Sequence, residues 1–131
     1  MIIAPYTREQ ARMLSPLQLA YIGDSVHAML VRQHLLQKNM NVKQMHLKSV
    51  QAVRAVSQAK TMDTILPLLS EEEISIIKRG RNAHAHHGNP KGATVSEYAS
   101  ATGLEALLGF LYLIDDMERL QFLLPYLMPE D

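Results

Sequence analysis

Apolar residues recur at helical spacing along most of the chain. The first strong pattern begins after Ser15-Pro16, where serine is a favoured N-cap and proline fits the first helical position, and it continues to about Lys38-Asn39. One or two further helices are predicted between residues 42 and 69. No segment keeps the two-residue alternation of a half-buried strand. The pattern therefore predicts an all-α protein.

The second half of the chain contains further helical patterns and one clear interruption. Ser70 and Glu73 have the spacing of a capping box and open the first of these helices. Two glycines and a proline then break the periodicity, and they predict a mobile loop at about 84–94. Helical periodicity resumes over 95–114, and a last short helix is predicted over 117–128, interrupted or ended by a proline.

Length and composition narrow the class of protein. A chain of 131 residues with 47% hydrophobic residues is the size of one ordinary domain, and we expect a single domain over 1–131 with its core at about 15–128. Because the chain has no cysteine, disulfides and thiolate metal sites are excluded. The apolar N-terminus lacks the basic flank of a signal peptide, and the longest apolar stretch is too short to span a bilayer. We therefore expect a soluble, cytoplasmic protein without a membrane partner.

The charges are unevenly distributed, although 13 basic and 13 acidic residues sum to zero. No acid occurs from Ser25 to Met62 or from Ile74 to Ser96, and both stretches carry several basic residues. Such a separation can give a basic face on a neutral molecule, as binding to a phosphate backbone requires. The charge pattern alone leaves open the alternative that these basic side chains point in different directions.

Two acidic residues lie inside strongly apolar helical patterns. Asp24 lies within LAYIGDSV, and Glu105 lies within GLEALLGFL. A carboxylate in such surroundings must be paired, protonated, bound to a metal or placed at the edge of a cleft. Each acid taken alone could instead lie on a narrow exposed stripe. We favour two facing helices, because small residues beside both acids would allow a close approach: Ala20, Gly23, Gly103 and Ala106.

A pair of carboxylates suggests a particular cofactor and chemistry. Without cysteine and without well-spaced histidine ligands, carboxylates suit a hard cation such as Mg²⁺. The matching chemistry is phosphodiester hydrolysis, in which the metal activates water and stabilises charge on the phosphate. The residues therefore favour a magnesium-dependent phosphodiester hydrolase.

The segments around these two acids resemble the two signature helices of the ribonuclease III catalytic domain. LAYIGDSV is similar to the first signature, in which two apolar residues precede Gly-Asp, and LEALLGFLYL is similar to the second, in which Glu-Ala-Leu, an apolar residue and glycine precede a tyrosine-containing apolar stretch. Their order and separation also fit, over about residues 15–113. KRGRNA at 78–83 and the expected absence of a following double-stranded-RNA-binding domain resemble the Mini-ribonuclease III branch.

This resemblance implies a ribonuclease III catalytic-domain-like helical bundle that acts as an endoribonuclease on double-stranded RNA. It implies that Asp24 and Glu105 are the catalytic residues and the Mg²⁺ ligands. Members of the branch are homodimers that mature the precursor of the large-subunit (23S) ribosomal RNA, and the same substrate and assembly are expected here. Whether a ribosomal protein assists is left open.

The chain departs from the larger family at two acidic positions. The family has a glutamate four residues before the aspartate and an aspartate three residues before the glutamate, whereas this chain has Ala20 and Thr102 there. At these spacings each lost acid would share a helix face with the remaining one. We therefore expect weaker Mg²⁺ binding than in the larger enzymes, and whether one or two metals bind is left open.

Basic residues beside the predicted loop are candidates for RNA binding. Double-stranded RNA is recognised mainly through its phosphates and 2′-hydroxyl groups. Arg81 and Asn82 are the first candidates for such contacts. Lys78, Arg79 and Lys91 would extend the same basic edge. The first two of these could instead stabilise the negative end of their own helix.

The histidines favour a structural interpretation over a metal site. His84, His86 and His87 do not share one helical face and no cysteine assists them, so we favour a solvated loop, with RNA contact as the next interpretation. His27 follows Asp24 by three residues. It is expected to be a partly buried structural histidine, with a contact in the outer shell of a metal as the alternative.

Three other functions fit parts of the sequence. A catalytically silent RNA-binding or ribosome-associated module of the same fold would explain the two lost acids but not the two that remain. A different helical phosphohydrolase would need an adjacent His-Asp pair, which the sequence lacks. A helical dimerisation module would explain the apolar helices but neither the acids nor the basic loop.

Overall fold

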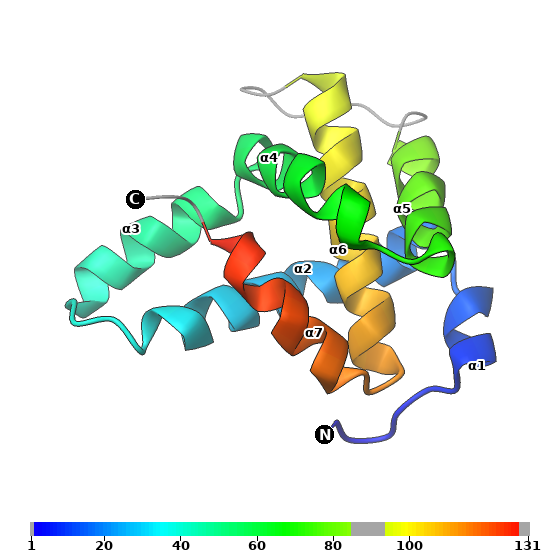
Figure 1. Cartoon of the computed structure of the whole chain (residues 1–131), viewed down its shortest axis with the longest axis horizontal. Helices are drawn as coiled ribbons and strands as arrows, with labels where there is room; N and C mark the ends of the chain where they lie inside the picture. Colours follow the sequence, from blue (N-terminus) through cyan, green and yellow to red (C-terminus); the bar gives the residue numbers. More distant parts are fainter. Residues whose placement is uncertain (1, 85–93, 129–131) are drawn as a thin grey trace.

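The computed structural model describes residues 2–84 and 94–128, and within these ranges every regular element is a helix (Figure 1). The predicted all-α fold is therefore confirmed. In chain order the elements are α1 (Arg8–Met13), α2 (Pro16–Leu35), α3 (Val42–Ala52), α4 (Ala55–Ile65), the 3₁₀ turn η1 (Leu66–Leu68), α5 (Glu71–His84), α6 (Val95–Leu113), α7 (Met117–Leu123) and the 3₁₀ turn η2 (Leu124–Leu127).

Side-chain caps define where most of these helices begin. The predicted capping box is present, because Glu73 N donates to Ser70 Oγ at 3.2 Å and Ser70 N donates to Glu73 Oε1 at 2.8 Å. Helices α1, α2, α3 and α6 start with the same reciprocal arrangement. Helix α1 was not expected from the apolar pattern, because it is six residues long and buries only Ala11. Its signal is the capping pair Thr7 and Gln10.

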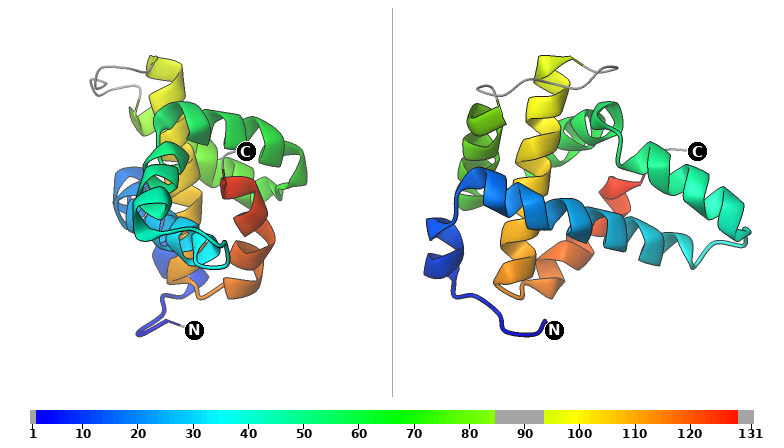
Figure 2. Two further views of the ribbon diagram at one scale, coloured as in Figure 1. Left: turned by 90° about the vertical axis from the view of Figure 1, so that its left-hand side faces the viewer. Right: turned by 180° about the vertical axis from the view of Figure 1, so that it is seen from behind.

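Helix α6 forms the centre of the molecule and is buried along most of its length. Helix α2 crosses it on one side, while α4, α5 and α7 pack around the remaining surface (Figures 1 and 2). The fully buried side chains of α6 include Leu104, Leu107, Leu108 and Phe110. A helix that is apolar around most of its circumference has to be surrounded in this way, since any exposed face would leave apolar surface in water.

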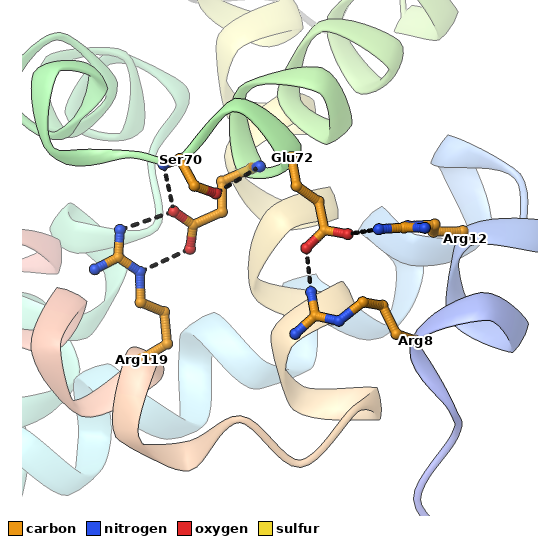
Figure 3. Close-up of polar contacts among 6 residues, drawn as sticks. Arg8, Arg12, Ser70, Glu72 and Arg119 are labelled. Atoms are coloured by element: carbon orange, nitrogen blue, oxygen red, sulfur yellow. Dashed lines mark hydrogen bonds and ion pairs between the residues drawn. The ribbon is translucent and has the colours of Figure 1, made fainter.

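Two groups of ion pairs hold the outer helices to α5 (Figure 3). Glu72 pairs with Arg8 and Arg12 of α1. Glu73 is buried and accepts two hydrogen bonds of 2.7 Å from Arg119 of α7. Burial alone would raise the pKa of Glu73, but the hydrogen bonds from Arg119 and Ser70 outweigh it and keep that pKa below its usual value.

At the C-terminal end, the short helix predicted over 117–128 is interrupted at the proline, as expected from the sequence. Helix α7 ends at Leu123, and the chain continues as a 3₁₀ turn that contains Pro125. Proline lacks an N–H group and is tolerated only in the first turn of a helix, so a new short turn begins there. Among the described helices, none has both the length and the apolar character needed to cross a membrane.

Candidate active site

The crossing of α2 and α6 brings the two predicted acids together. Gly23 lies against the backbone of Glu105 and Gly109, and a methyl group at Gly23 would overlap the carbonyl oxygen of Glu105. In the same way, a methyl group at Gly109 would overlap the carbonyl oxygen of Leu19. The two helices therefore touch backbone to backbone. This crossing brings the side chain of Asp24 within hydrogen-bonding reach of Glu105.

The small residues beside the acids serve two different crossings. We expected Gly103 and Ala106 to face α2, but they face α5, where Gly80 lies against both of them. The partner of Gly23 in the α2 crossing is Gly109 instead. Helix periodicity explains the difference, because residues six apart, such as 103 and 109, point about 120° away from each other.

Asp24 and Glu105 form a pair of like charges at the edge of the core. Asp24 is exposed, whereas Glu105 is partly buried. Burial, the charge of Asp24 and a hydrogen bond between the two carboxyl groups together raise the pKa of Glu105 to about 8, although the hydrogen bond from Gln58 acts in the opposite direction. Among the described residues, no lysine or arginine forms an ion pair with either acid. The pair therefore shares a proton or needs a cation.

One further residue at this pair was not predicted. Gln58 of α4 is buried, and its Nε2 donates to Glu105 Oε2 at 3.4 Å. The sequence did contain a signal, since Gln58 lies in line with the buried residues Met62 and Ile65 on one face of α4. A polar residue on such a stripe has to find a partner in the core.

The two positions without acids contribute no ligand. Ala20 is buried, and the hydroxyl group of Thr102 donates to the carbonyl oxygen of Tyr98 at 2.9 Å. Within the ranges 2–84 and 94–128, no three His, Cys, Asp or Glu side chains gather to hold a metal ion. A cation at Asp24 and Glu105 would therefore complete its coordination with water or with oxygen atoms of the substrate.

His27 is more deeply buried than we expected, with 1% of its surface exposed. Burial lowers its pKa to about 4, although the charge of Asp24 acts in the opposite direction. The imidazole is therefore neutral at physiological pH, and neither ring nitrogen has a hydrogen-bond partner in the described part of the chain. We infer a structural residue, as the sequence suggested.

The predicted RNA-binding residues fall into two groups. Lys78, Arg81 and Asn82 are exposed on α5. Arg79 instead points to the end of α1, where its guanidinium donates to the carbonyl oxygens of Arg12 and Leu14 at 3.5 and 3.3 Å. His84 ends α5, while Lys91, His86 and His87 lie outside the described residues, as does nearly all of the loop predicted at 84–94.

Comparison with known proteins identifies the family. The model of the ribonuclease III domain matches residues 17–116. A Mini-ribonuclease 3 of a Thermoanaerobacter species is 46% identical over 90% of this chain and 83% of its own, and that of Streptococcus pneumoniae is 35% identical over 87% and 91%. A crystal structure of a Fusobacterium nucleatum protein superposes with a TM-score of 0.78 at 32% identity, over 87% of this chain and 91% of the other. The chain therefore belongs to the ribonuclease III family, in its Mini-ribonuclease 3 branch, and is an endoribonuclease of the ribonuclease III type.

Proposed function

We propose that the protein cleaves double-stranded RNA by metal-dependent hydrolysis, with Asp24 and Glu105 as its catalytic residues. The observation that carries the proposal is the backbone contact at Gly23, which holds two carboxylates together without a cationic partner among the described residues. Two ionised carboxylates in this arrangement cost stability unless a proton or a cation neutralises part of their charge. The family supplies a matching activity, since a bound cation can assist hydrolysis of a phosphodiester by activating water and stabilising charge on the phosphate.

Mg²⁺ is the cation that the donor set suits best. Both side chains offer oxygen atoms, and Mg²⁺ is commonly bound by one or two carboxylates together with water and substrate phosphates. When bound, the cation would polarise the scissile phosphate and lower the pKa of the attacking water. Asp24, being exposed, would provide the more accessible oxygens, whereas Glu105 would fix the position of the cation relative to α6.

Helix α5 offers the first surface for the RNA backbone. Lys78, Arg81 and Asn82 are exposed and can reach phosphates and 2′-hydroxyl groups. The stem of Arg81 packs over Gly103 of α6, so that its charged end is supported by the same helix that carries Glu105. Lys91 is proposed to extend this surface. Arg79 stays a predicted RNA contact, although its guanidinium also holds the end of α1.

We further propose that the active form is a homodimer assembled through α2. A groove of about 270 Å³ lies between α2, the end of α6 and α7, and its lining is mainly apolar. Beside it on α2, Tyr21 and Met29 are 83% and 66% exposed. A groove and projecting apolar side chains on one face suit a self-complementary, two-fold interface. Two copies would also provide the two sites needed to cut both strands of a duplex.

The biological substrate is proposed to be the precursor of the large-subunit (23S) ribosomal RNA, processed in the cytoplasm. The support is similarity to the Mini-ribonuclease 3 proteins over most of the chain. The same similarity supports duplex RNA as the substrate class.

The decisive experiment is cleavage of a long double-stranded RNA by the purified protein with Mg²⁺, with chelator and with the variant Asp24→Asn. We expect discrete fragments that require Mg²⁺, and a loss of at least about 100-fold in rate for the variant, as for removal of a group that stabilises a transition state. A Mg²⁺ titration should saturate no lower than the millimolar range. Binding without cleavage, unchanged by chelator or by the substitution, would instead indicate a catalytically silent RNA-binding module.

A further inference from the structure

Gln58 is a buried polar residue that the proposed chemistry does not yet use. It lies in the first turns of α4, and 3% of its surface is exposed. Its Oε1 atom has no hydrogen-bond partner among the described residues. Burying an amide oxygen without a partner destabilises the folded state, commonly by about 1–3 kcal/mol. Stability alone would therefore favour an apolar side chain at this position.

The amide nitrogen of Gln58 donates two hydrogen bonds to neighbouring groups. Nε2 donates to the carbonyl oxygen of Val53 at 2.9 Å, in the turn that joins α3 to α4. It also donates to Glu105 Oε2 at 3.4 Å. The first bond fixes the amide to the backbone, and the second then restricts the carboxylate of Glu105. Gln58 holds one oxygen of the Glu105 side chain, Oε2.

The neighbours of Glu105 on its own helix and on α2 do not provide this restraint. Thr102 directs its hydroxyl group to Tyr98, and Ala20 has no polar side-chain atom. Within the described part of the chain, two side chains form hydrogen bonds with Glu105, and these are Asp24 and Gln58. Restraint of a metal ligand by a hydrogen-bonded neighbour sets its orientation and commonly affects metal affinity.

We propose that Gln58 is a positioning residue that orients the carboxylate of Glu105 for cation binding and catalysis. This role rests on the proposed function of Asp24 and Glu105. Gln58 acts through Glu105 and does not itself contact the RNA.

The test replaces Gln58 by methionine, which has a similar length and shape but no hydrogen-bond donor. Three quantities are measured for Gln58→Met: the kinetic constants for double-stranded RNA, the binding of Mn²⁺ to the RNA-free protein by electron paramagnetic resonance, and the melting temperature in chelator. We expect kcat and Mn²⁺ affinity each to fall by about 10–100-fold, the usual effect of removing such a neighbour, with KM unchanged. The melting temperature should change little, because removal of an unpartnered buried oxygen and loss of the two hydrogen bonds from Nε2 act in opposite directions.

A matched control is Gln51→Met, at an exposed position on α3, which should leave all three quantities unchanged. Unaltered kcat and Mn²⁺ affinity in Gln58→Met would overturn the positioning role, and so would a loss of kcat that only follows a lower melting temperature. If either outcome is found for Gln58→Met while Asp24→Asn is inactive, the proposed catalytic pair stands and only the role of Gln58 fails. Full activity of Asp24→Asn would overturn both.

Discussion

The raised pKa of Glu105 makes proton binding and cation binding compete for the same oxygens. Burial and the charge of Asp24 bring this pKa to about 8, so that the carboxyl group of the cation-free protein is largely protonated at neutral pH. Metal ligands have to be deprotonated, and binding of the cation therefore releases a proton. The activity of the enzyme should for this reason depend on pH and on Mg²⁺ together.

At limiting Mg²⁺ we expect the cleavage rate to increase with pH through a midpoint near 8, the pKa of Glu105, and to level off above it. A higher Mg²⁺ concentration should shift the midpoint to lower pH, because the cation displaces the proton. The measurement is a series of single-turnover rates between pH 6 and 9 at several Mg²⁺ concentrations. A midpoint that does not move with Mg²⁺ would contradict the assignment of Glu105 as a ligand.

Thermal unfolding in the presence of chelator tests the raised pKa of Glu105 independently of activity. The pKa of Glu105 is raised in the folded protein from an ordinary value of 4.5 to about 8, so folding favours its protonated form. The associated stability is present at low pH and is lost as the pH rises towards 8. The melting temperature should therefore fall between pH 6.5 and 8.5, and Glu105→Gln should show a smaller fall. This window lies above the range in which His27, with a pKa of about 4, would titrate.

The proximity of Asp24 and Glu105 was predictable because both residues break a local rule, whereas their catalytic role stays a prediction. Asp24 and Glu105 could be found because a carboxylate in an apolar helix needs a partner, and the resemblance of their surroundings to known signatures pointed the same way. Gln58 was missed because its partner lies 47 positions away in the sequence. A pairing over this distance cannot be predicted from a local sequence pattern. The buried face of α4 can be identified only when the first residue of the helix is known.

At the scale of helices, periodicity predicted the order of the elements but not how they cross. The long helices α2 and α6 were expected because their apolar patterns are long. Which small residue faces which neighbour depends on rotation about the helix axis, and this explains why Gly109, and not Gly103, meets Gly23. Helix α1 was missed because six residues are too few to show a period.

The α2–α6 crossing can be tested with Gly23→Ala. The new methyl group would overlap the backbone of Glu105, which cannot rotate away as a side chain would, so the helices have to separate. We expect destabilisation of at least about 1–3 kcal/mol, as for overpacking of a core, despite the higher helix propensity of alanine. Cleavage should also be lost, because Asp24 moves with α2. Denaturant unfolding and single-turnover cleavage measure the two effects.

Gly80→Ala, at the crossing of α5 and α6, is a matched control. It separates the effect of disturbed helix packing from the effect on the catalytic residues. At Gly80 the nearest atom to a new methyl group is the Cα of Gly103, at 2.9 Å, and the overlap is milder than at Gly23. Gly80→Ala should therefore destabilise the protein less and retain most of its activity. Equal losses of activity in the two variants at equal folded fraction would argue that the α2 crossing has no special role in the site.

At the scale of the whole molecule, the exposed apolar face of α2 is the feature that the monomer does not explain. Tyr21 and Met29 project from this face beside the groove that α2 forms with α7. Exposed apolar groups of this size commonly mark an interface. Contact with a second copy would remove them from water and would place two carboxylate pairs in one particle, as the cutting of a duplex requires.

The variant Met29→Lys tests this assembly, with Met13→Lys as its control. Both methionines are largely exposed, at 66% and 81%, but Met13 lies on α1, away from the groove. A stable two-fold interface buries about 800 Å² on each partner, and a lysine at its centre would bury a charge without a partner. We expect Met29→Lys to sediment as a monomer and to cleave duplex RNA much more slowly at equal protein concentration, whereas Met13→Lys should behave as the unmodified protein. If Met29→Lys remained dimeric and fully active, the interface would have to lie elsewhere, and the apolar face of α2 would need another occupant.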